Sequence, residues 1–259
     1  MPRGRVQGKA FPYLTENDDF PFPDPESADA DGIVCAGGNL SPGLLLSAYR
    51  RGIFPWFSDG QPILWWSPDP RFVLKPEELH ASATMRKLLR RSSREEGFEL
   101  SLDRDFEAVI RSCSSVERPG QDGTWITEGM IEAYRELHRL GFAHSAEVRR
   151  GGRLVGGLYG VSLGSVFFGE SMFSLEDDAS KLAFIPLAWR LRDEGFTLVD
   201  AQVYTGHLAG LGAQEIPRID FLHLLSMCLA APTRRGDWGR LFPSFPESSE
   251  YGRTVRRGP

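Results

Sequence analysis

The chain has 259 residues and a mass of 28.9 kDa, and its 30 Lys and Arg against 35 Asp and Glu give a formal net charge of −5. Hydrophobic residues make up 41% and charged residues 25%, a balance that excludes fibrous and wholly disordered chains. No apolar run reaches the roughly 18 residues that span a bilayer, and the basic N-terminus lacks the apolar stretch of a secretory signal. We therefore expect a cytoplasmic protein with no membrane partner.

Residues 1–69 are expected to form a small N-terminal domain that begins with a flexible arm. The composition of residues 1–32, rich in proline and acidic side chains, favours a loosely held segment. Ser41, a good N-cap residue, begins a helix that Gly52 ends. The proline- and tryptophan-rich stretch at residues 54–71 excludes a regular helix and predicts an ordered loop with one short strand.

Residues 70–247 are expected to form the larger domain, and residues 248–259 a disordered tail. Apolar periodicity and capping residues predict helices at residues 82–94, 103–113, 127–140, 179–194 and 217–229. Apolar runs bounded by turn residues predict strands at residues 144–149, 153–159, 165–172 and 197–203. The glycines between the first three strands indicate an antiparallel meander, and the whole order predicts a mixed α/β (α+β) fold.

The sequence carries no recognisable cofactor or metal motif. It contains no GxGxxG, no Walker-type loop, no HExxH and no CxxC, so we expect neither a cofactor nor a metal. Residues 160–164 match the GxSxG pattern of α/β-hydrolases, with Ser162 as the serine. That motif needs a helix directly after the serine, whereas residues 165–172 are predicted as a strand. A hairpin turn is therefore favoured over a nucleophile.

One predicted helix is strongly basic, and several aromatic residues are candidates for base stacking. At 100° per residue, an arc of roughly 140° on the helix at residues 82–94 holds all of its cations, which are Arg86, Lys87, Arg90, Arg91 and Arg94. A solvated helix face is the simplest explanation, but unneutralised cations in an acidic chain favour a phosphate-bearing partner. Tyr49, Trp56 and Trp125 are either core residues or rings on which an unstacked base can lie.

Polar residues inside apolar strands indicate a site. Glu170 interrupts the apolar run FFGESMF, where a carboxylate needs either a ligand or an internal salt bridge. Asp200 and Gln202 are two residues apart on a predicted strand, so they are expected to share one face. A carboxylate beside a carboxamide can position and deprotonate an amine.

Six segments in a fixed order, within roughly residues 31–218, match one known family: GGNLSPGLLLSAYRRGIFPWF, PILWWSPDPR, GTWIT, EAYRELHRLGFAHSAEV, GGLYGVSLGSVFFGESMFS and DAQVY…HLAGLGAQEIPR. The chain resembles the leucyl/phenylalanyl-tRNA–protein transferases. The resemblance implies a small N-terminal domain and a larger GNAT-like domain with a mostly antiparallel sheet. It also implies an aminoacyltransferase that moves Leu or Phe, with Met as a further donor, from aminoacyl-tRNA to proteins that begin with Arg or Lys. The product is a degradation signal, and we expect the enzyme to be a monomer.

The resemblance also assigns roles to residues. Glu170 binds the basic N-terminal residue of the acceptor or its amine, and Asp200 and Gln202 orient or deprotonate that amine. The aromatic residues near the terminal adenosine of the tRNA are Tyr49, Trp56, Trp125 and Tyr134. The apolar pocket for the transferred side chain consists of Leu158, Phe167, Met172, Phe184, Leu187 and Val199. The acceptor stem is held by Lys87, Arg90 and Arg91, with Arg86 or Arg94 standing in for an arginine that is Ala83 here. A second departure, Thr205-Gly206, follows Gln202.

Two other functions remain as alternatives. A GNAT-like acyltransferase that uses acyl-CoA needs a phosphate-cradling loop at a strand-to-helix turn, and the sequence shows none. A non-catalytic tRNA-binding module would share the basic helix and the aromatic residues but would not depend on Asp200 or Gln202.

Overall fold

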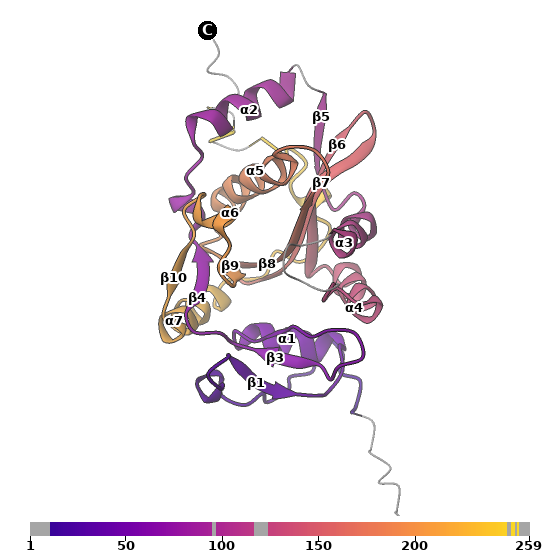
Figure 1. Cartoon of the computed structure of the whole chain (residues 1–259), viewed down its shortest axis with the longest axis vertical. Helices are drawn as coiled ribbons and strands as arrows, with labels where there is room; N and C mark the ends of the chain where they lie inside the picture. Colours follow the sequence, from indigo (N-terminus) through magenta and orange to yellow (C-terminus); the bar gives the residue numbers. More distant parts are fainter. Residues whose placement is uncertain (1–10, 95–96, 117–123, 248–249, 252, 254–259) are drawn as a thin grey trace, which may run out of the picture.

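The computed structural model describes residues 11–94, 97–116, 124–247, 250–251 and 253, with the backbone alone for residues 91–94 (Figure 1). A small unit built from residues 11–69 lies against one end of a larger α/β body, at the bottom of Figure 1. Buried side chains of both parts, such as Leu45 and Phe168, belong to one hydrophobic cluster. The two parts therefore share a core.

The small unit consists of one helix on a three-stranded sheet. Helix α1 spans Pro42–Arg50, and the strand order is β1 (Ile33–Ala36), β3 (Leu64–Trp66) and β2 (Phe54–Pro55). Residues 42–49 of α1 are all buried, because the helix lies between its own sheet and the larger body. The predicted helix is confirmed, while the segment at residues 54–71 holds two short strands and the start of a third rather than one.

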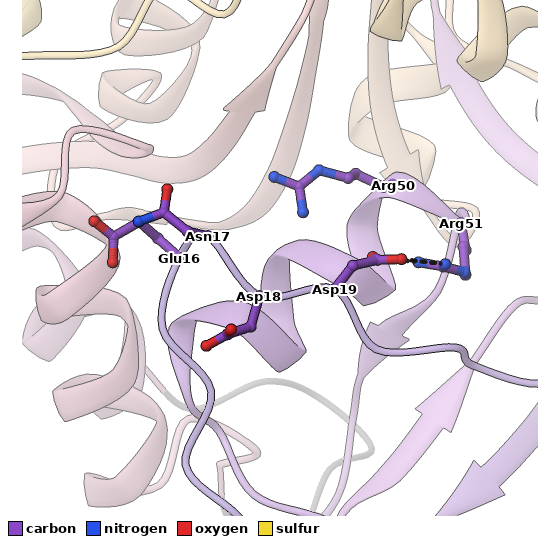
Figure 2. A pocket seen from close by; sticks show the side chains of 6 residues that line it. All are labelled: Glu16, Asn17, Asp18, Asp19, Arg50 and Arg51. Carbon is purple, nitrogen blue, oxygen red and sulfur yellow. Dashed lines mark hydrogen bonds and ion pairs between the residues drawn. The ribbon is translucent and has the colours of Figure 1, made fainter.

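Residues 11–32, whose composition predicts a loosely held segment, have mostly exposed side chains but make specific contacts with the small unit, and residues 1–10 lie outside the described part. Phe22 is 8% exposed, and its ring lies 4.9 Å from that of Trp65. Arg51 donates two hydrogen bonds to the Asp19 carboxylate, at 2.9 and 3.0 Å, at the edge of a charged hollow shown in Figure 2. Phe22 and Asp19 thus each link this segment to the small unit, through Trp65 and Arg51 respectively.

A seven-stranded sheet forms the centre of the larger body. In spatial order its strands are β10 (Gln214–Ile216), β4 (Arg71–Leu74), β9 (Leu198–Gln202), β8 (Val166–Ser174), β7 (Arg153–Leu163), β6 (Ala143–Arg150) and β5 (Phe98–Leu102). All neighbours are antiparallel except β8 and β9. The mixed α/β class, the mostly antiparallel sheet and the β6–β8 meander are confirmed. Strands β4, β5 and β10 were not predicted from the sequence.

Helices cover both faces of this sheet. Helix α5 (Ala179–Asp193) lies on one face, and α3 (Phe106–Ser115) and α4 (Glu128–Arg139) lie on the other (Figure 1). The remaining helical segments are η1 (Pro25–Ser27), η2 (Pro76–Glu78), α2 (Ala83–Arg94), α6 (Gly206–Ala209), α7 (Arg218–Leu229) and α8 (Trp238–Leu241). In the described part of the chain, no helix combines the length and apolarity needed to cross a membrane.

The GxSxG segment forms a hairpin, as its sequence predicted. Ser162 is buried within β7, and β8 follows after a turn in which Gly164 has a φ of +55°. A Cβ at Gly164 would lie 2.2 Å from the carbonyl oxygen of Cys228. Glycine is therefore required both by the backbone conformation and by the close approach of α7.

Helix α5 approaches β7 closely at Gly156. A Cβ at this position would lie 2.6 Å from the Cβ of Ala179 and 2.9 Å from the Ala179 carbonyl carbon. Real Cβ atoms do not come so close, so only glycine allows the first turn of α5 to lie where it does.

The C-terminal segment is ordered in part. Tyr251 is 3% exposed and packs in the cluster that includes Trp189 and Leu89. Glu250 forms an ion pair with Arg86 of α2. The tail expected to be disordered from residue 248 onward is therefore anchored at Tyr251, and residues 248–249, 252 and 254–259 lie outside the described part.

Candidate active site

The candidate site lies where two parallel strands separate. Strands β8 and β9 pair only over three residues each: Val166–Phe168 of β8 pair with Leu198–Asp200 of β9. Beyond these residues the strands no longer pair, and a cavity of about 800 Å³ occupies the opening. Both strands line it, together with residues of β2, β7 and α5. The cavity between the separating strands has a mostly apolar lining with a few polar groups, which is typical of ligand-binding sites.

Most of the residues singled out in the sequence meet at this cavity. It is lined by Trp56, Trp125, Leu158, Phe167, Glu170, Met172, Phe184, Val199 and Gln202. Leu187 does not line it: this side chain is 1% exposed and packs on the core side of α5. The charged hollow of Figure 2, on the small unit, holds none of the predicted site residues.

Glu170 is the centre of a hydrogen-bond network on the cavity wall. The Tyr49 hydroxyl donates to Oε1 at 2.7 Å, and the Tyr134 hydroxyl donates to Oε2 at 2.9 Å. Gln202 Nε2 donates to Oε1 at 3.3 Å. The two tyrosine hydroxyls also contact each other. The two tyrosine hydroxyls and the Glu170 carboxyl group thus make three oxygen–oxygen contacts, but the hydroxyls supply only two hydrogens. A proton on Glu170 would supply the third.

Burial makes Glu170 a weaker acid than an ordinary carboxyl group. Removal from water raises its pKa to about 7, while the hydrogen bonds from Tyr49 and Tyr134 lower it and the nearby Asp200 charge raises it. Burial and the Glu170 charge raise the pKa of both tyrosines well above 10, so both are neutral donors. At neutral pH, Glu170 is poised between its protonated and ionised forms.

Asp200 does not face the cavity, contrary to the shared face expected for it and Gln202. Its side chain has no exposed surface, and Arg71 grips both of its oxygens at 2.9 and 2.7 Å. Its Oδ1 also accepts the backbone N–H of Gln202 at 3.0 Å. Within this pair only Gln202 lines the cavity, so direct contact between Asp200 and an attacking amine is not available in this arrangement.

Tyr49 and Tyr134 likewise differ from their expected place beside a base. Both are fully buried, with the Tyr49 ring 4.9 Å from Phe168 and the Tyr134 ring 5.6 Å from Tyr159. Neither ring offers a free face, and both residues reach the site through their hydroxyls. Of the four predicted aromatic residues, Trp56 and Trp125 remain as half-buried rings on the cavity wall.

The basic helix α2 is remote from the small unit, at the top of Figure 1. Lys87 is exposed and Arg90 is half-buried. Arg86 is tied to the body: it donates to the Ala81 carbonyl oxygen at 3.1 Å and pairs with Glu250. The side chains of Arg91 and Arg94 lie outside the described part. Arg86 is thus less free to meet a phosphate than its place on the helix suggested.

Functional residues that were not predicted from the sequence also lie at the site. Arg71 holds Asp200, and Tyr204 and His207 line the cavity. A signal for Arg71 existed, because this lone cation opens an apolar strand immediately after the segment SPDP. Tyr204 and His207 follow Gln202 closely in the chain, but nothing in their own pattern marks them.

Comparison with known proteins matches the chain to one family. A sequence model described as leucyl/phenylalanyl-tRNA protein transferase matches residues 73–226, and a model of the N-terminal domain of the same transferase matches residues 38–69. The chain belongs to this family. A leucyl/phenylalanyl-tRNA–protein transferase of Myxococcus xanthus is 55% identical over 230 residues, which cover 88% of this chain and 97% of that protein. One of Ectopseudomonas mendocina is 52% identical over 86% of this chain and 97% of that protein.

Solved structures match more weakly. L-PGS from Bacillus licheniformis has a TM-score of 0.38 at 15% identity, covering 54% of this chain and 49% of that chain. A GCN5-related N-acetyltransferase from Kribbella flavida has a TM-score of 0.33 at 12% identity, covering 68% and 61%. Likenesses of this size carry no argument here, and family membership rests on the sequence matches.

Proposed function

We propose that this aminoacyltransferase moves Leu or Phe, with Met as a further donor, from aminoacyl-tRNA to the N-terminal α-amine of proteins that begin with Arg or Lys. The observation that carries the proposal is the Glu170 carboxyl group, held by Tyr49, Tyr134 and Gln202 at the wall of an apolar cavity. The product is an N-terminal degradation signal, made in the cytoplasm. We expect the protein to act as a monomer.

The donor's side chain fits the apolar wall formed by Leu158, Phe167, Phe184 and Val199. A pocket of this kind distinguishes side chains that differ by one methylene by only about 1–3 kcal/mol, so more than one apolar amino acid is accepted. Trp56 and Trp125 line the same cavity, and we assign them to the terminal adenosine, where stacking on a ring contributes about 1–3 kcal/mol per base.

The acceptor is selected by charge. Among the described residues that line the cavity, Glu170 is the only carboxyl group. When ionised it attracts a cationic N-terminal residue and repels an acidic one. This asymmetry supports acceptors that begin with Arg or Lys.

The transfer needs no external energy source, because the aminoacyl ester is already activated. The amine nitrogen attacks the ester carbonyl carbon, the bond from that carbon to the ribose oxygen breaks, and the tRNA leaves with its hydroxyl restored. An α-ammonium group has a pKa of about 7.7–8.0, close to the pKa of about 7 of Glu170, so proton transfer between them costs only about 1–1.5 kcal/mol. Glu170 can hold the amine and take its proton, while Gln202 orients both.

The acceptor stem of the tRNA is assigned to the basic face of α2. Lys87, Arg90 and Arg91 supply the phosphate contacts, and Arg86 contributes beside its ion pair with Glu250. A concentration of cations on one helix in a chain of net charge −5 supports an anionic partner at this place.

The decisive experiment is transfer of labelled leucine from leucyl-tRNA to two peptides that differ only in an N-terminal Arg or Glu, without ATP. We expect product with the Arg peptide alone. Equal product with both peptides would overturn the role of Glu170. Product with neither peptide, despite tRNA binding, would favour the non-catalytic binding module.

A further inference from the structure

Arg71, the first residue of β4, is fully buried and does not line the cavity. Its Nε donates to Asp200 Oδ1 at 2.9 Å and its Nη2 donates to Oδ2 at 2.7 Å. Both side chains have no exposed surface. A two-pronged bond of this kind fixes the carboxylate plane as well as its position.

Asp200, fixed in this way, in turn holds the backbone of Gln202. Its Oδ1 accepts the Gln202 backbone N–H at 3.0 Å, and Gln202 has a φ of +58°. A left-handed conformation is unfavourable for any residue other than glycine and persists only where its surroundings hold it. In this conformation the Gln202 side chain reaches Glu170. A chain of contacts therefore runs from Arg71 through Asp200 and Gln202 to Glu170.

The guanidinium also packs against two aromatic rings. Its central carbon lies 4.9 Å from the Phe54 ring of β2 and 4.5 Å from the Phe221 ring of α7. Phe54 also lines the cavity. Arg71 is therefore seated where the small unit, the sheet and α7 meet, and its orientation depends on all three.

Stability alone explains this ion pair poorly. Taking two charges out of water costs much of what their attraction returns, and apolar replacements of buried pairs are often neutral or stabilising. In addition, Arg71 Nη1 is buried without a hydrogen-bond partner among the described residues. The geometry is better explained by the orientation that it imposes.

We infer that Arg71 is a positioning residue of the transfer reaction, one that sets Gln202 and Glu170 through the buried Asp200 carboxylate. The inference rests on the proposed function and deepens it. It divides the polar residues of the site into two that meet substrate, Glu170 and Gln202, and two that set them from behind.

The test compares Arg71→Lys with Arg218→Lys. Lysine keeps the charge at position 71 but cannot form the two-pronged bond. Arg218 is a matched control, because it is also buried, at 8% exposed, and bonds to Glu26 and to the Ser67 carbonyl oxygen away from the cavity. With Leu-tRNA and an Arg peptide, we expect kcat to fall at least tenfold in R71K with the KM for Leu-tRNA within twofold of wild type. R218K should lower the melting temperature and leave kcat within twofold.

A second readout separates positioning from simple loss of structure. The ionisable groups that face Glu170 are Tyr49, Tyr134, Asp200 and Arg71, from α1, α4, β9 and β4. Asp200→Asn removes a like charge from beside Glu170, so the acidic limb of the pH profile of kcat/KM should move to lower pH. R71K keeps both charges and should leave that limb in place while kcat falls. A variant that merely unfolds in part loses activity at every pH, and its acidic limb does not shift.

Two results test the inference, and a third tests the proposed function separately. If wild type transfers leucine and R71K keeps its kcat, Arg71 is structural and the inference is wrong. If R71K does not fold, the paired exchange Arg71→Met with Asp200→Leu leaves no unpaired charge inside and must show the same loss of kcat with retained tRNA KM. A wild-type protein that transfers nothing would overturn the proposed function instead.

Discussion

Tyr49 and Glu170 are 121 residues apart in the chain, and the Tyr49 hydroxyl donates to Glu170 Oε1 across 2.7 Å. Tyr49 belongs to the helix of the small N-terminal unit, whereas Glu170 belongs to the central strand β8. Glu170 is the only carboxyl group among the described cavity-lining residues, and its ionisation therefore depends on contacts from both parts of the molecule.

Loss of this hydroxyl should change the pH dependence of transfer. The hydrogen bond from Tyr49 lowers the pKa of Glu170, so Tyr49→Phe raises it and moves the acidic limb of kcat/KM to higher pH. Because a hydrogen bond to a charged group contributes about 1.5–3 kcal/mol, we expect roughly tenfold lower activity near pH 6 and a smaller loss near pH 9. Tyr13→Phe, at an exposed tyrosine, is the control. An identical limb in both variants would contradict the prediction.

Glu170→Gln should affect stability and activity in opposite directions. The pKa of Glu170 is raised from 4.5 to about 7 in the folded state, so folding is favoured by protonation, and this stability is lost as pH rises through about 7. The glutamine variant escapes that loss. Its free energy of unfolding relative to wild type should rise by about 1–3 kcal/mol between pH 4.5 and 7.5.

Urea titrations at several pH values measure this difference. Glu215→Gln, at an exposed glutamate of β10, should show a flat difference over the same range. Transfer to the Arg peptide should fall by at least tenfold in E170Q at every pH. A stability difference that shrinks as pH rises would show that burial does not weaken this acid.

Trp125 should matter for the donor and not for the acceptor. Trp125→Leu keeps an apolar side chain on the cavity wall but removes the ring on which a base can stack. We expect the KM for Leu-tRNA to rise by about 5- to 100-fold, the equivalent of about 1–3 kcal/mol. The KM for the Arg peptide should stay within twofold. A change in the peptide KM alone would assign Trp125 to the acceptor side.

Cations on α2 should differ in their effect on tRNA binding. Lys87 is exposed, so Lys87→Ala should lower the slope of log K against log salt by about 0.7–0.9, the share of one phosphate contact. Arg86 is already paired with Glu250, and Arg86→Ala should lower the melting temperature while changing the slope less. Lys75→Ala, at a cation paired with Glu78 outside α2, is the control. Equal slopes for K87A and wild type would place the tRNA elsewhere.

Several elements of the site were accessible from the sequence because their polarity conflicts with their surroundings. Glu170 in FFGESMF and Gln202 in LVDAQV interrupt apolar strands, and both line the cavity. The same reasoning placed Asp200 on a shared face with Gln202, and it failed because the strand period of two ends where Gln202 takes a positive φ.

Other contacts could not be predicted because they join distant parts of the chain. Arg71 meets Asp200 across 129 positions, and nothing near either residue marks the pairing. Aromatic composition identified Tyr49 without showing that its hydroxyl, rather than its ring, acts at the site. Burial of Phe22 likewise depends on Trp65, so the composition of the early segment suggested a loose arm.

The size of the cavity depends on the absence of a side chain at Gly156. Gly156 does not line the cavity, yet it allows α5 to settle on β7, and α5 supplies Ser180 and Phe184 to the wall. A single added methyl group, as in Gly156→Ala, would push that helix outward and enlarge the cavity from behind. Donor preference in this protein is thus open to redesign through a residue that does not itself contact the donor.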